Sequence, residues 1–99
     1  MKKLFLYEVI NNFKELISKN NIKIEYAKNE ELNFENSAEQ VDLLSYDYLM
    51  RITLFDNDRM YIHVINISTE ETLYFFDDYI NDKLSAENLI IDAIKMMIF

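Results

Sequence analysis

The chain has 99 residues, of which 51% are hydrophobic, so it can close one core and is expected to form a single domain over residues 1–99. Eighteen acidic against ten basic residues give a formal net charge of −8, which repels phosphates and anionic lipids and therefore disfavours direct binding to nucleic acid or membranes. The absence of cysteine excludes disulfides and thiol chemistry, and a cytoplasmic location is expected.

The first predicted element is an amphipathic helix over residues 4–17, whose apolar side chains recur every three or four positions. The sequence contains neither glycine nor proline, so backbone positions with positive φ must be filled by Asn or Asp. The helix is therefore expected to end at Asn20 and Asn21. Apolar and polar residues then alternate over residues 22–26, which predicts a short strand.

The residue pattern in the middle of the chain predicts most of the strands of a sheet. Residues 28–39 form the most polar run, which is read as a long loop or an irregular edge segment, and residues 41–44 could form another strand. Residues 48–55 and 60–67 are rich in β-forming side chains and flank the polar turn 56–58. This arrangement predicts a β-hairpin.

A second turn over residues 68–71 leads into a strand over residues 72–76, so the strands should continue as an antiparallel meander. Ser85 is a candidate N-cap for a helix over residues 86–97. The order and the short connections predict an α+β fold, in which an antiparallel β-meander of about four strands is flanked by an N-terminal and a C-terminal helix.

Both faces of the predicted hairpin are apolar, whereas a sheet with one solvated face should alternate between apolar and polar residues. The favoured interpretation is that helices or loops cover both faces. The alternative is that the second face binds a partner or a second copy. The large side chains of this second face are Leu49, Phe55, Tyr61, Ile65 and Ile67.

The predicted C-terminal helix is apolar almost all round, which is typical of a buried helix. The alternative to burial is a homodimer contact through Met96, Met97 and Phe99. That contact would fit a homo-oligomeric structural or adaptor protein.

The sequence contains no recognisable catalytic or metal-binding motif. His63 is the only histidine, and no cysteine or in-strand serine is available as a nucleophile beside it. Asp56 and Asp58 have the opening spacing of a calcium loop, but the Gly and the terminal Glu of that loop are missing. We therefore predict that the protein is not an enzyme and has no cofactor or metal.

The carboxylates gather in predicted turns, where they could attract a basic surface of a larger protein and raise the association rate. The alternative is that they solvate the turns and block strand edges. Tyr61 of the second face is also a candidate contact residue, because a tyrosine can anchor a protein interface. The candidate contact residues are Glu30, Glu31, Glu35, Asp56, Asp58, Tyr61, Glu70, Glu71, Asp77 and Asp78.

From residue 42 onward the pattern resembles the TriTu family of bacterial immunity proteins. The resemblance is carried by the runs LMRITLF at 49–55, HVINISTEE at 63–71 and SAENL at 85–89. It implies a protein that neutralises a cognate polymorphic toxin by binding it. The chain is also similar to small acidic anti-CRISPR proteins of phages, which implies carboxylates that imitate DNA phosphates on a basic nuclease channel.

Overall fold

The computed structural model describes residues 5–26 and 38–98, and its strands form one antiparallel sheet in the order β1-β2-β3-β4-β5. Each strand thus pairs with its neighbours in the chain, which confirms the predicted α+β meander with five strands instead of about four. The elements are α1 (Leu6–Asn12), α2 (Lys14–Lys19), β1 (Lys23–Tyr26), β2 (Ala38–Leu44), β3 (Tyr48–Phe55), β4 (Arg59–Asn66), β5 (Thr72–Tyr79) and α3 (Lys83–Ile98).

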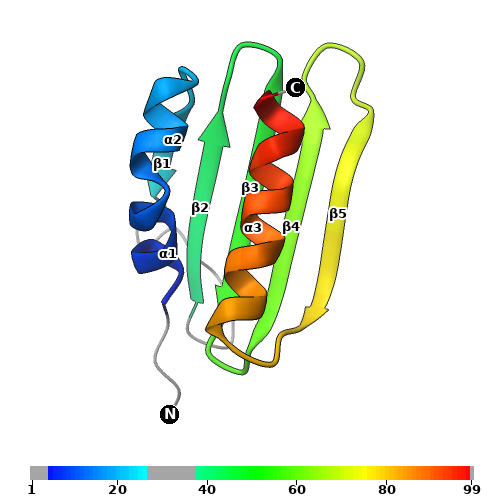
Figure 1. Cartoon of the computed structure of the whole chain (residues 1–99). Coiled ribbons are helices and arrows are strands. Elements are labelled where there is room, and N and C mark those ends of the chain that lie inside the picture. The colour runs from blue at the N-terminus through cyan, green and yellow to red at the C-terminus, as the bar shows by residue number, and fades with distance from the viewer. Residues whose placement is uncertain (1–4, 27–37, 99) are drawn as a thin grey trace.

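The helices of the described chain all pack on the same face of the sheet (Figure 1). The helix α3 crosses β3 and β4, and α1 and α2 lie beside it over β1 and β2. Among the described residues, helices therefore do not cover both sheet faces, while the alternative that loops cover the second face stays a prediction. The physical reason is that the centre of one face is apolar, whereas the other also carries polar residues such as Arg51, Thr53 and His63.

The hydrophobic core lies between the helices and this apolar sheet face. The strand side chains that enter it alternate with those that point away, as the pleat of a strand requires. The helix α3 buries one stripe, including Ile90 and Ile94, while Leu84 and Met96 on its outer side are 64% and 43% exposed. The strand residues of the core are Val41, Leu43, Met50, Ile52, Leu54, Met60, Ile62 and Val64.

The predicted N-terminal helix is interrupted at Phe13, where φ is −99° and ψ is 9°. The Phe13 N–H donates to the carbonyl of Ile10, three residues back, which tightens the turn and separates α1 from α2. The apolar spacing continues through the break because the half-buried Phe13 side chain still packs against the core.

The end of α2 confirms the prediction for Asn20 and Asn21. Asn21 has a φ of 58°, and its N–H donates to the carbonyl of Ser18. The N–H of Ile22 donates to the carbonyl of Ile17, so the helix closes with the Schellman pattern. An asparagine thus takes the position that glycine fills in most proteins.

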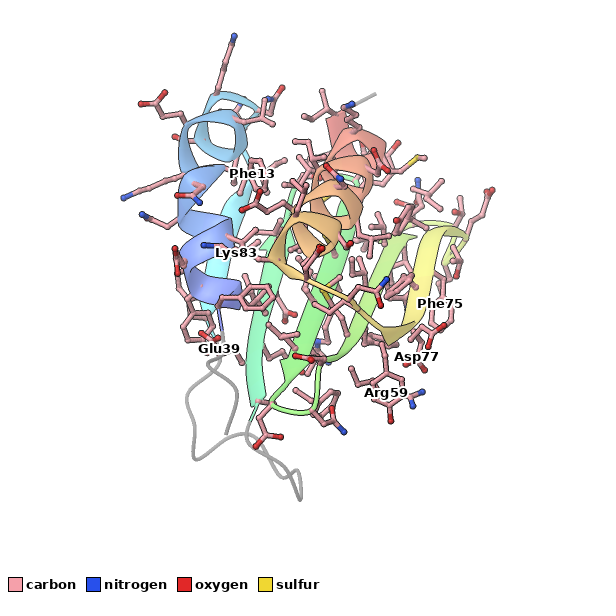
Figure 2. The ribbon with its side chains drawn as sticks, turned by 60° about the horizontal axis from the view of Figure 1, so that its bottom comes forward. Phe13, Glu39, Arg59, Phe75, Asp77 and Lys83 are labelled. Atoms are coloured by element: carbon pink, nitrogen blue, oxygen red, sulfur yellow. The ribbon has the colours of Figure 1, made fainter. Side chains whose placement is uncertain are left out.

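Side chains from outside the helices satisfy the N–H groups at two helix starts. The Glu39 carboxylate of β2 accepts hydrogen bonds from the N–H groups of Leu6 and Tyr7 at 3.1 and 3.4 Å, and Figure 2 shows it at the first turn of α1. At α3, Asp82 accepts from the Ser85 N–H at 2.8 Å. The prediction that Ser85 caps this helix is therefore wrong, because the cap lies at Asp82 and the helix begins three residues earlier than expected.

Candidate functional site

The sheet surface opposite the helices is the candidate site with the most organised side chains among the described residues. Strand alternation and register bring side chains from all five strands onto it. We call this surface the helix-free face. It consists of Lys23, Glu25, Gln40, Asp42, Leu44, Leu49, Arg51, Thr53, Phe55, Arg59, Tyr61, His63, Ile65, Thr72, Phe75, Asp77 and Tyr79.

Two cross-strand ion pairs organise the polar part of this face. Arg51 lies opposite Asp42 and holds both of its carboxylate oxygens, with Nε–Oδ1 and Nη2–Oδ2 distances of 2.9 and 3.0 Å. Arg59 of β4 donates to Asp77 Oδ1 of β5 at 3.0 Å, and Figure 2 shows the two side chains together. Hydrogen bonding to these carboxylates raises the pKa of each arginine, so both guanidinium groups stay charged.

The helix-free face is electrically balanced although the protein is acidic. Lys23 and Glu25 form a third ion pair, at 3.4 Å. With His63 counted as neutral, the three cations of the face are thus matched by three carboxylates. The formal charge of −8 therefore comes from residues outside this set.

An aromatic cluster occupies the side of the face formed by β4 and β5. The rings of Tyr61 and His63 each meet that of Phe75 edge-on, at centroid distances of 5.7 and 5.6 Å. The guanidinium of Arg59 lies 5.6 Å from the centroid of the Tyr79 ring. Phe75 and Tyr79 nevertheless remain 58% and 55% exposed, so the cluster presents ordered aromatic surface to the outside.

The two ring nitrogens of His63 have side-chain partners. Nδ1 lies 3.2 Å from the Tyr61 hydroxyl, and Nε2 lies 2.9 Å from the Thr72 hydroxyl. Thr72 was not among the candidate nucleophiles, which were limited to cysteine and serine. Neither of these partners is a carboxylate that would orient the ring as a catalytic base, and the group lies on an open sheet surface that does not exclude water. The geometry fits a histidine fixed in place by its neighbours.

Two shallow hollows indent the helix-free face. The larger has a volume of about 390 Å³ and the smaller about 170 Å³, and Arg51 and Tyr61 contribute to both. Thr53, which is 4% exposed, donates to Gln40 Oε1 at 3.0 Å in the lining of the larger one. The other residues of the larger hollow are Phe55, Arg59 and Asp77.

The structure places the predicted contact residues at different locations on the molecule. Tyr61 and Asp77 lie on the helix-free face and line the larger hollow. Asp56 and Asp58 lie in the β3–β4 turn, which is joined to the end of β5 by a hydrogen bond from the Ile80 N–H to the Asp58 carbonyl at 2.9 Å. Asp78 is exposed at this end, but it pairs with Met60 and so points to the helix side.

Glu70 and Glu71 lie in the β4–β5 turn at the opposite end of the strands. The eight residues of β4 separate them from the β3–β4 turn by about 25 Å, at roughly 3.3 Å per residue. The structure therefore does not bring the predicted carboxylates to one point. Glu30, Glu31 and Glu35 lie outside the described residues.

Arg59, Phe75 and Tyr79 belong to the helix-free face but were not among the predicted contact residues. The last strand was expected to end at residue 76, whereas β5 continues to Tyr79 and presents alternate residues beside β4. Continuing the period-two alternation from Phe75 past Asp77 would have placed Tyr79 on the same face, but it does not account for Arg59 on β4 or for Phe75, which lies within the predicted strand.

The structure bears only in part on the predictions about a homodimer, a membrane span and a metal site. Of the proposed dimer contacts, Met97 is 6% exposed and packs in the core, while Phe99 lies outside the described residues, so the homodimer stays a prediction. In the described ranges, no helix has the length and apolar character needed to cross a membrane. The same ranges contain no cluster of three or more side chains suited to holding a metal ion.

Comparison with known families gives one match. The family model described as Immunity protein TriTu matches residues 6–93, from the start of α1 into α3. The match begins well before residue 42, where the resemblance seen in the sequence starts, and it includes all strands of the helix-free face. No curated protein matches the chain.

Proposed function

Because the chain belongs to the TriTu family of immunity proteins, we propose that it is a non-enzymatic inhibitor that binds a bacterial polymorphic toxin in the cytoplasm and neutralises it. The observation that carries this proposal is the family match over residues 6–93. The neighbours of His63 support a role in binding, since they fix the ring without supplying a catalytic carboxylate.

The net charge supports a toxin with a basic contact surface. A charge of −8 attracts a cationic surface over the Debye length of about 8 Å at physiological salt, and such steering can raise association rates by about 10- to 1,000-fold. Asp56 and Asp58 at one end of the sheet, and Glu70 and Glu71 at the other, are the described residues to which we assign this steering.

The proposal predicts a salt-dependent association with the toxin. The probe is a toxin domain sought among the genes adjacent to the one that encodes this chain, and binding is followed by stopped-flow fluorescence together with the residual toxin activity. Toxin activity is expected to disappear as the complex forms, and the association rate is expected to fall steeply with rising ionic strength. The double variant Asp56→Asn, Asp58→Asn should bind more slowly and with a weaker salt dependence.

The matched control is Glu15→Gln with Asp92→Asn, which removes the same charge from exposed positions on α2 and α3. This control should associate with the toxin faster than the turn variant, because the charges that it removes lie on the helix layer. A toxin that stays fully active in the presence of the chain would refute the inhibitory function. An association rate that does not change with salt would refute the steering.

A further inference from the structure

We infer that the helix-free face is the surface that docks on the toxin, and that its occupant is an apolar patch of the toxin rimmed by lysine and arginine. This inference rests on the proposed function and extends it, because the carboxylates of the turns alone do not define a continuous contact surface. They lie at opposite ends of β4. This strand is about 25 Å long, because it has eight residues and a strand rises roughly 3.3 Å per residue.

The charge distribution specifies the chemistry of this occupant. The cations of the helix-free face are each held by a carboxylate, so the middle of the face offers no surplus charge to a partner. The acidic turns border it at both ends. An apolar centre with a basic rim is the surface that complements a balanced centre with acidic ends. Protein interfaces have this anatomy, with net charge depleted at the core and Tyr, Phe and Arg enriched there.

The side chains at the centre of the face are ordered before a partner arrives. Arg51 is held by the two hydrogen bonds that it donates to Asp42, and the ring of Phe75 is held edge-on by Tyr61 and His63. Immobilising a flexible side chain on binding costs about 0.5–1.5 kcal/mol, and contacts that already exist in the free protein reduce that cost. Preorganised Arg and aromatic side chains are also the residue types that dominate measured binding energies.

The shape of the face provides an anchor point. The shallow hollow of about 390 Å³ lies beside Tyr61. A protruding apolar side chain of the toxin would enter it between Phe55 and Tyr61. The exposed rings of Phe75 and Tyr79 would then cover neighbouring toxin surface.

The dimensions of the sheet explain how the turns take part. Three strands have eight residues, whereas β1 has four and β2 has seven, so the five strands side by side cover less than about 26 by 19 Å, or under roughly 500 Å², from standard strand spacings. A stable interface buries about 800 Å² on each partner. A complex centred on this face must therefore extend over its ends, where the acidic turns meet the basic rim.

The test compares exposed apolar residues on the two sides of the molecule. Phe75→Ala with Tyr79→Ala truncates the helix-free face, and Leu84→Ala with Met96→Ala is the matched control on α3. The exposed fractions are 58% and 55% for the first pair and 64% and 43% for the second, so neither truncation opens a core cavity. Binding to the same toxin domain is measured by biolayer interferometry, with circular dichroism to show that each variant is folded.

We expect the Phe75/Tyr79 variant to raise Kd by about tenfold or more, mainly through faster dissociation, whereas the control stays within about twofold of the wild type. Wild-type binding that survives the Phe75/Tyr79 change but is lost with Leu84/Met96 would overturn the inference and leave the proposed function intact. Absence of wild-type binding would instead refute the proposed function. Sedimentation that shows a dimer of the free chain, dissociated by the Phe75/Tyr79 change, would assign the face to a second copy and also overturn the inference.

Discussion

Glu70 is held in the left-handed region of the backbone, with a φ of 62°. Asn21 and Asp58 are the other described residues with positive φ, and they follow the expectation that Asn or Asp takes such positions in a chain without glycine. Glu70 contradicts that expectation. The turn maintains its conformation because the Asn66 side chain accepts from the N–H groups of Ser68 and Thr69, and the Glu70 N–H donates to the Asn66 carbonyl at 2.8 Å.

Replacing Glu70 by Asn should stabilise the protein, because Asn tolerates the left-handed region better than a residue with a long side chain. We expect the free energy of unfolding to rise by about 0.5–1 kcal/mol, on the scale of left-handed backbone strain. Urea denaturation followed by circular dichroism measures it. The control is Glu71→Asn, which removes the same charge next to Glu70 and should give no such gain. A fall in stability for Glu70→Asn would contradict this account of the turn.

At the scale of an element, the start of α3 depends on Asp82. Its carboxylate accepts from the Ser85 N–H, and the backbone N–H and the hydroxyl of Ser85 together lower the pKa of the carboxyl below its ordinary value of 3.8. A negative charge at a helix N-terminus is also favoured by the helix dipole. Since the folded-state pKa is lowered, this contribution to stability is present above pH 3.8 and is lost as the pH falls through the lowered pKa.

Two substitutions at this position separate hydrogen bonding from charge. Asp82→Ala removes the cap and should lower the melting temperature at neutral pH, whereas Asp82→Asn keeps an acceptor and should lower it less. The gap between the wild type and Asp82→Asn should close as the pH falls well below 3.8, because the wild-type carboxyl is then protonated. Thermal denaturation at a series of pH values follows both differences. A gap that widens at low pH would show that the carboxylate is not the stabilising species.

At the scale of the whole molecule, apolar burial and surface ion pairs both attach the helices to the rest of the fold, but they contribute very different amounts of stability. Ile94 of α3 is fully buried in the core cluster that joins the helices to the sheet. Lys83 also connects α3 to α1 through Glu8, with an Nζ–Oε1 distance of 2.6 Å, but the two side chains are 40% and 54% exposed. Figure 2 shows Lys83 between these helices. Solvent screens such a pair, so burial is the stronger term.

Ile94→Ala should therefore lower the free energy of unfolding by about 2–5 kcal/mol, through lost burial and the cavity that remains. Lys83→Gln should change it by less than about 1 kcal/mol, as expected of an exposed ion pair. Chemical denaturation of both variants compares the two terms directly. A larger loss for Lys83→Gln than for Ile94→Ala would mean that the ion pair, and not the core, secures α3.

Signals that act over a few residues were sufficient to predict the elements. Strand periodicity around the turn 56–58 predicted the hairpin of β3 and β4, and the pair Asn20–Asn21 predicted the end of α2. These features depend on the conformational preferences and hydrogen bonds of neighbouring residues, which the sequence alone displays. The same local signals correctly placed Asp56, Asp58, Glu70 and Glu71 in turns, whereas Asp77 and Asp78 lie in β5 and not in the predicted connection. The signals also placed Tyr61 on a strand.

Only the tertiary structure decided which sheet face the helices cover and which side chains meet on the other. The hairpin carries large apolar side chains on both faces, so its pattern left open whether the face with Arg51, Thr53 and His63 was also covered until the helices were packed against the sheet. Arg51 meets Asp42 and Arg59 meets Asp77 through strand register, and Glu39 reaches α1 from 33 residues away. Such contacts depend on how distant segments share one core. The sequence by itself therefore determined a charged, meander-forming chain without catalytic motifs, and long-range packing decided which side chains meet on the helix-free face.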